Sequence, residues 1–202
     1  MSKHSVQFLL KGRISMVHDW LIRAGEVVSA DEFVHIFSKD APPIGWHLWH
    51  MARFTDRLQH KLAVLLDDPT ASEIWYRDHV ARSWNISPNQ LGVFETGMGQ
   101  VHQQAQSVII KGGQTAISNY AQAVFERCNT TINKLTDSDF EKTYDGILDY
   151  GYDAATGKVW STEPKESVVA QDLIFHASHG SRHMGMMEAL RGLLGTAGTL
   201  SV

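Results

Sequence analysis

The 202-residue sequence contains one cysteine, Cys128, so it cannot form an internal disulfide or a structural zinc site made of several thiolates. Its apolar runs are far shorter than the ~20 residues that a membrane-spanning helix needs. The short apolar stretch near the N-terminus is interrupted by Lys11 and Arg13, unlike a signal peptide. A basic excess is also missing, because 18 Lys and Arg oppose 22 Asp and Glu. These absences predict a cytoplasmic protein that binds neither nucleic acid nor membranes.

The composition is that of a folded chain, with 43% apolar and 20% charged residues. The length predicts a single domain over residues 1–202. Strand patterns are nearly absent, whereas apolar residues recur at helical spacing over residues 5–24, 44–66, 114–135 and 164–194. Each of these segments has one apolar stripe that must be buried. They therefore predict an all-α four-helix bundle with extra short helices and long connecting loops.

Two capping boxes predict short helices between the long ones. Ser29 and Glu32 have the required spacing and would open a helix over 30–38. Thr70 and Glu73 have the same spacing and would open a helical stretch that ends near residue 83.

Glycine and proline mark further boundaries. Gly25 is a plausible stop for the first long helix, and Gly112-Gly113 predicts a break between a helical piece that starts at His102 and the third long helix. Thr162 and Pro164 suit the cap and first turn of the fourth. The 142–163 segment lacks clear periodicity, so we expect a loop or a small hairpin there.

Histidine is the unusual residue of this sequence, with 11 copies. The fourth long helix places His176, His179 and His183 in the same arc as its apolar stripe, so these rings should point into the core. His179 and His183 are one turn apart and could bind one ion at the 2.0–2.1 Å typical of zinc–imidazole bonds. His47 and His50 of the second long helix are about equally inward, and either could supply a third imidazole. The apolar stripe of the fourth helix comprises Val168, Phe175, Met186, Leu190 and Leu193.

Several other metal sites do not fit this pattern. A zinc protease needs a glutamate after the first histidine, and that position is Gly180. A ferritin-like di-iron site needs two Glu-x-x-His motifs, and the only one, Glu32 to His35, lies outside the long helices. A mononuclear site remains, in which three neutral nitrogen ligands leave coordination positions open, as in catalytic centres. The alternative is that the inward histidines are hydrogen-bonded core residues.

Two stretches carry a family resemblance. The segment Gly45–Arg53, followed by Asp56, resembles a second-helix signature in which a tryptophan precedes the first metal ligand by one turn. The stretch His176-x-x-His179-x-x-x-His183-Met184-Gly185 resembles a fourth-helix ligand pair with its following glycine. Both belong to the DinB-like (DinB/YfiT) superfamily of metal-dependent enzymes, which this chain resembles in element order and length over about residues 5–194.

The resemblance implies a mononuclear site with His50, His179 and His183 as ligands to one divalent transition metal, with zinc or nickel favoured. His176 then becomes a neighbour of the site, as a hydrogen-bond partner of a ligand, a substrate contact or a core residue, with the last two favoured. His47 is a second candidate for contact with a ligand or a small-molecule substrate.

Further residues could shape a pocket. Trp46 could line a substrate pocket or belong to the core. Arg53 and Arg57 could each bind a carboxylate, but Arg57 lies nearer the inward face of its helix, and we expect Arg53 at the surface. Arg182 flanks the two histidines and could reach the mouth of a cavity.

Such a site supports two reactions. The ion could bind and deprotonate a low-molecular-weight thiol cosubstrate, or it could lower the pKa of a bound water toward 7 for hydrolysis. Some members of the superfamily are thiol-dependent transferases or isomerases, which favours thiol chemistry on a small electrophilic substrate. A non-catalytic stress-response or binding protein, with a structural or empty metal site, is the alternative from a different class. An exposed bundle face could serve for homodimerisation, which the sequence leaves open.

Overall fold

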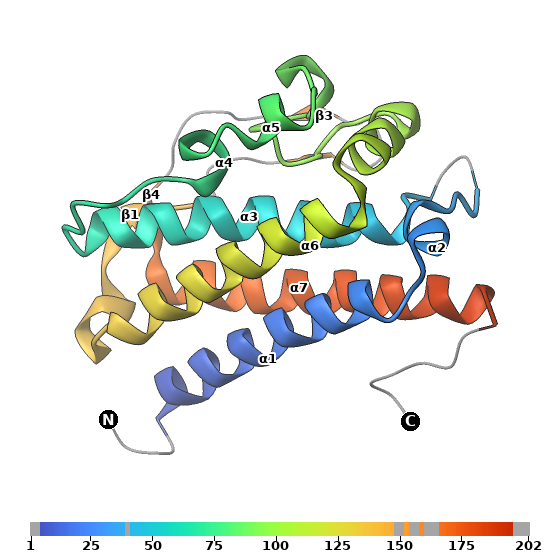
Figure 1. The fold of residues 1–202 in the computed structure, drawn as a ribbon. Coiled ribbons are helices and arrows are strands. Elements are labelled where there is room, and N and C mark those ends of the chain that lie inside the picture. Colours follow the sequence, from blue (N-terminus) through green and yellow to red (C-terminus); the bar gives the residue numbers. More distant parts are fainter. Residues whose placement is uncertain (1–4, 39–40, 148–151, 154–157, 160–165, 196–202) are drawn as a thin grey trace.

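Four long helices form the body of the protein: α1 (Val6–Glu26), α3 (Ile44–Leu65), α6 (His102–Lys134) and α7 (Val169–Leu193). Both α1 and α3 pack against α6 and α7, so the four helices form a closed ring in the order α3, α6, α1, α7 (Figure 1). The all-α four-helix bundle is therefore confirmed. The computed structural model describes residues 5–38, 41–147, 152–153, 158–159 and 166–195.

The apolar stripes expected from the sequence are buried in most of the bundle. Ile14, Val17 and Leu21 of α1 are inaccessible to solvent, and so are Ile117 and Cys128 of α6. The stripe expected for α7 is wrong at two positions, where the side chains are exposed; Met187, next in sequence to the first of them, is buried instead. These two exposed residues are Met186 and Leu193.

Gly25 lies inside α1 and does not end it, contrary to expectation, because α1 continues to Glu26. A Cβ atom at Gly25 would lie 2.8 Å from Cδ2 of Leu48 in α3. The missing side chain therefore lets two helices approach closely, so this glycine serves packing and not termination.

The short helix α2 (Ala30–Val34) begins at the capping box that the sequence predicts. The Ser29 hydroxyl accepts a hydrogen bond from the Glu32 backbone N–H, and the Glu32 carboxylate accepts one from the Ser29 N–H. The helix is shorter than the expected 30–38 and ends at Val34.

The second expected capping box does not form. Thr70 hydrogen-bonds to Asp68 instead, and the helices of this segment are α4 (Ile74–Arg77) and α5 (Val80–Ser83). The first backbone N–H groups of α4, those of Ile74 and Trp75, donate to the Asp56 carboxylate at 2.9 and 2.8 Å. The cap of α4 therefore comes from Asp56 of α3. Asp56 is distant in sequence, so the cap could not be predicted from local residue spacing.

The break expected at Gly112-Gly113 is confirmed as a kink within α6. Gly113 has φ 72° and ψ 159°, which a helix cannot contain, so α6 consists of two helical pieces. The first piece turns away from the bundle and joins the layer that carries α4 and α5 above α3 (Figure 1). A 3₁₀ turn, η1 (Pro88–Gln90), lies between α5 and α6.

Extended segments precede α7. After the 3₁₀ turn η2 (Asp137–Glu141), β1 (Thr143–Asp145) pairs antiparallel with β4 (Glu166–Val168). A second pair joins β2 (Tyr152–Asp153) to β3 (Lys158–Val159), in keeping with the small hairpin expected there. The fourth long helix thus starts at Val169 and not at 164, while the proposed cap at Thr162 and Pro164 lies outside the described residues.

The late start of α7 has a visible cause in its first turn. The buried Asp172 carboxylate accepts hydrogen bonds from the Tyr144 hydroxyl, the Ile147 backbone N–H and the Ser167 hydroxyl. These bonds hold β1 and β4 in extended form beside the helix end.

Among the described residues, no helix combines the length and the apolar character that crossing a membrane requires.

Candidate metal centre

Three buried histidines from two helices converge inside the bundle. His50 comes from α3, and His179 and His183 come from α7 one turn apart. One ring nitrogen from each lies within 4.8 Å of the other two, and this group could hold a metal ion. The three are the residues that the family resemblance implies as ligands.

The distances between these nitrogens suit a shared cation. The Nε2 atom of His179 lies 3.3 Å from Nε2 of His50 and 2.9 Å from Nε2 of His183. Ligands placed tetrahedrally at 2.0–2.1 Å around zinc lie about 3.3–3.4 Å from one another. The His50–His179 distance already matches this spacing, and the His179–His183 distance is shorter than it.

The hydrogen-bonding capacity of the three rings also favours a cation. His50 Nδ1 lies 2.5 Å from the Thr96 carbonyl oxygen, so Nδ1 carries the proton and Nε2 offers a lone pair. Whichever nitrogen of His179 is protonated, a single N–H cannot serve the Nε2 atoms of both neighbours. In every combination of tautomers at least one of the three Nε2 atoms therefore lacks a partner, and a cation would satisfy all three once each offers a lone pair.

His47 orients one of the three rings from outside. Its Nδ1 atom lies 2.8 Å from Nδ1 of His183. If His183 offered Nε2 to an ion, its Nδ1–H would donate to the Nδ1 lone pair of His47, and such outer hydrogen bonds orient metal-bound histidines. The two candidate histidines of α3 therefore have different positions. His50 belongs to the three-histidine group, and His47 contacts the outer nitrogen of His183.

Burial keeps these imidazoles in the neutral form that a metal requires. It lowers the pKa of His50 to about 3 and that of His179 to about 2. It also lowers the pKa of His183, and the positive charge of Arg182 adds to each of these shifts. Arg182 itself is exposed, so the site has a solvent-facing cation at its edge.

Trp46 packs against the site and not only within the core. Its ring stacks on the His50 ring with centroids 4.5 Å apart and planes 12° apart. Arg57 is buried with its guanidinium 4.3 Å above the centre of the Phe94 ring. Both residues therefore contact elements that surround the histidines.

His176 belongs to a second buried polar group. Its Nε2 atom lies 2.9 Å from Nε2 of His18, whose Nδ1 lies 2.8 Å from the Asn129 side-chain oxygen. The His18 ring also stacks on Phe125 with centroids 4.4 Å apart. This pair links α1, α6 and α7 in the core, which fits the core reading of His176.

A buried ion-pair network lies one turn further along α3. Arg53 and Asp56 are inaccessible to solvent and contact one another at 3.2 Å. Arg53 also binds Glu73 at 2.9 Å, and the Tyr120 hydroxyl donates to Asp56 at 2.9 Å. The network attaches the 73–97 layer to the bundle, although the sequence predicted a surface position for Arg53.

The sequence missed the segment that touches His50 most closely. The sequence is ambiguous over residues 85–113, yet Thr96 of this segment supplies the carbonyl that fixes the His50 ring. The only local signal is the spacing of Gly92, Gly97 and Gly99, which is typical of a tight loop.

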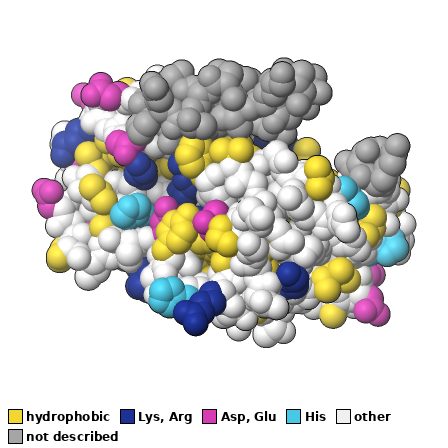
Figure 2. Space-filling model, turned by 90° about the horizontal axis from the view of Figure 1, so that it is seen from above, with side chains coloured by type: hydrophobic (Ala, Val, Ile, Leu, Met, Phe, Trp, Pro, Cys, Tyr) yellow, Lys and Arg dark blue, Asp and Glu magenta, His cyan; other side chains and the backbone are white. Residues whose placement is uncertain are grey.

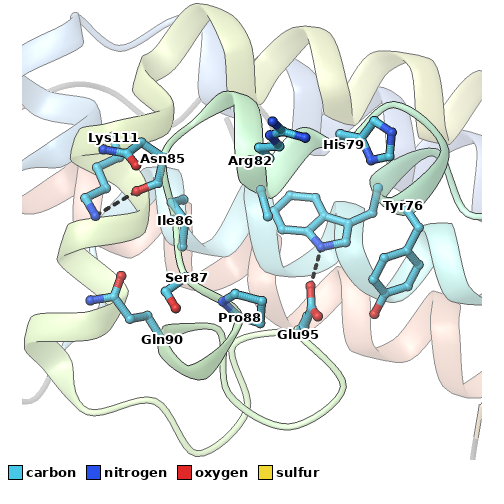
Figure 3. A pocket seen from close by; sticks show the side chains of 12 residues that line it. Tyr76, His79, Arg82, Asn85, Ile86, Ser87, Pro88, Gln90, Glu95 and Lys111 are labelled. Carbon is cyan, nitrogen blue, oxygen red and sulfur yellow. Dashed lines mark hydrogen bonds between the residues drawn. The ribbon is translucent and has the colours of Figure 1, made fainter.

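A cavity of about 750 Å³ lies in the outer layer, away from the three histidines (Figure 3). Its wall includes the Trp75 and Tyr76 rings, with Arg82, Lys111 and Glu95 among the polar side chains. Seen from above the view of Figure 1, the described surface has Lys and Arg interspersed with Asp and Glu and not gathered in one patch (Figure 2). Of the residues that line the cavity, Glu95 is the sequence neighbour of Thr96, whose carbonyl contacts His50.

Comparison with known proteins supports the fold. No family model matches the chain, and no curated protein matches it. A solved structure, described as that of a conserved protein from Enterococcus faecalis, is similar with a TM-score of 0.66 and 14% identity. The match covers 95% of this chain and 99% of that one. At this identity the likeness concerns the fold alone.

Proposed function

We propose that the protein binds one divalent transition metal, zinc or nickel, through His50, His179 and His183. The observation that carries the proposal is the convergence of three buried Nε2 atoms whose protons cannot satisfy one another. Three imidazoles leave coordination positions for a substrate, as catalytic sites do. We further propose that the chain is a distant DinB-like protein, since the three residues are those that this resemblance implies.

The chemistry we propose is transfer or isomerisation that uses a low-molecular-weight thiol and a small electrophilic substrate. A bound ion would act as a Lewis acid that promotes loss of the thiol proton. The chain's own thiol is unsuited to this role, because Cys128 is buried and burial raises its pKa. Arg182, exposed beside the ligands, would attract an anionic group of the thiol or substrate.

Elemental analysis of the untagged protein tests the site. We expect about one zinc or nickel ion per chain after purification in buffer that contains both metals. A metal content near zero, with the fold intact by circular dichroism, would refute the proposed function.

A second experiment tests the reaction. The metal-loaded protein is assayed with glutathione or cysteine together with a panel of electrophiles, and separately with esters and amides. Turnover that requires the thiol supports the proposal. Turnover of esters or amides without thiol identifies a hydrolase instead, and no turnover in either assay indicates a binding protein.

A further inference from the structure

We infer that the loop Gly92–Gln100, called here the support loop, positions His50 for metal binding. The inference rests on the proposed function and adds to it the part of the chain that aims a ligand. The loop is remote from α7 in sequence and contributes no ligand of its own among the described residues.

The support loop acts on His50 through one direct contact and one indirect contact. The Thr96 carbonyl accepts the Nδ1–H of His50, which fixes both the tautomer and the direction of Nε2. The Gln100 side-chain oxygen accepts the indole N–H of Trp46 at 2.8 Å, and Trp46 stacks on the His50 ring. The hydrogen bond therefore fixes the direction of the imidazole within its plane, and the stacking fixes the orientation of that plane.

The loop has a backbone that is held in an uncommon conformation. Phe94 and Glu95 both have positive φ, 52° and 54°, without being glycine. Non-glycine residues keep such angles only where surrounding structure imposes them, and they cluster at functional sites. Here the Val93 N–H donates to the Met98 carbonyl and the Gly97 N–H to the Leu91 carbonyl, both at 2.8 Å.

The core holds the loop from the other side. Arg53 donates to the Glu95 carbonyl at 3.0 Å, and the Trp75 indole N–H donates to the Glu95 carboxylate at 2.6 Å (Figure 3). Arg57 lies over the Phe94 ring. Arg53, Arg57 and His50 all belong to α3, so the helix that presents the ligand also fixes the loop that orients it.

Gly97 is where the loop meets the tryptophans of α3. Its φ is +93°, and a Cβ atom there would lie 2.8 Å from Trp49 Cζ3 and 2.9 Å from Trp46 Cζ2. Any side chain would push the loop, and with it the Thr96 carbonyl, away from His50. Because the contact to His50 is a backbone carbonyl, Gly97 is a better place to disturb it than Thr96 itself.

The experiment measures Co²⁺ affinity and the visible spectrum of the Co²⁺ protein for Gly97→Ala. The control is Gly113→Ala, which also places alanine at positive φ but meets no atom within 4 Å. We expect Gly97→Ala to weaken Co²⁺ binding about 10- to 100-fold and to change the spectrum, as loss of an outer partner does. Gly113→Ala should bind Co²⁺ like the parent protein.

The outcomes separate the two hypotheses. If the parent protein binds no Co²⁺, the proposed function fails. If it binds Co²⁺ and Gly97→Ala matches it in affinity and spectrum, the support loop has no positioning role while the metal site stands. Should Gly97→Ala not fold, Gln100→Leu removes the acceptor for Trp46, and a several-fold loss of affinity relative to the exposed-site control Gln103→Leu is then required.

Discussion

His50 can offer an ion only one of its two nitrogens, since the other donates to the Thr96 carbonyl. We expect His50→Ala to remove a ligand and to reduce bound zinc or nickel from about one per chain to near zero. Elemental analysis after gel filtration measures this loss.

The matched control is His79→Ala, which removes an exposed histidine outside the three-histidine group. It should keep the full metal content. Equal metal in the two variants would mean that the buried cluster is not the binding site.

For individual site residues, helical geometry predicted only which side chains face the core. A turn of 100° per residue places His179 and His183 inward because that rule depends on nothing outside the helix. The same rule could not separate His47 from His50, and both are indeed buried. What distinguishes them is a carbonyl from Thr96, and a tight loop with strained backbone leaves little trace in residue spacing.

Asp56 acts on a whole element, because its carboxylate caps α4 and pairs with Arg53. We expect Asp56→Asn to lower the free energy of unfolding by about 3 kcal/mol, since it leaves a buried guanidinium with a weaker partner. Urea denaturation at pH 7 measures the change.

Asp78→Asn is the comparison for this prediction. Asp78 pairs with Arg77 where both side chains are 48% exposed, so its loss should cost at most about 1 kcal/mol. Similar losses in the two variants would show that the buried network contributes no more than a surface pair.

The helices themselves were largely predictable, and the errors at the starts of α4 and α7 share one cause. Long apolar stripes give α1, α3 and the second piece of α6 within a few residues. The start of α4 was wrong because its cap comes from α3, and the start of α7 was wrong because β4 pairs with β1. Both boundaries depend on partners distant in sequence, which local propensity does not register.

Buried neutral histidines make the stability of the whole molecule depend on pH. Burial lowers the pKa of His18 to about 4 from its ordinary 6.5. As the pH falls, His18 is therefore protonated in the unfolded chain before it is protonated in the folded chain. The stabilisation that the neutral folded-state imidazole provides is complete above pH 6.5 and is lost as the pH falls toward 4. In metal-free protein the loss from this residue should reach about 3 kcal/mol.

His18→Gln tests this by removing one titrating group. Urea denaturation between pH 7 and 4 should show a shallower decline than in the parent protein, while His79→Gln, at an exposed position, should follow the parent. Parallel pH curves for all three would contradict the assignment.

Metal binding should stabilise the bundle because its ligands join α3 to α7. At a free metal concentration about 100 times the dissociation constant, we expect about 2.7 kcal/mol of added stability. Thermal melts with and without zinc measure the shift, which should be absent in His50→Ala. A shift that persists in that variant would point to zinc bound elsewhere.

The arrangement of α3 also constrains how this chain can vary among its descendants. His50 and Arg53 contact the Thr96 and Glu95 carbonyls of the support loop, while Asp56 holds Arg53 and caps α4, so the three must keep their angular relation. Inserting or deleting one residue between them would rotate one of them by about 100° against the others. We therefore expect length changes to accumulate in surface connections such as 67–72 and to be excluded from residues 46–56.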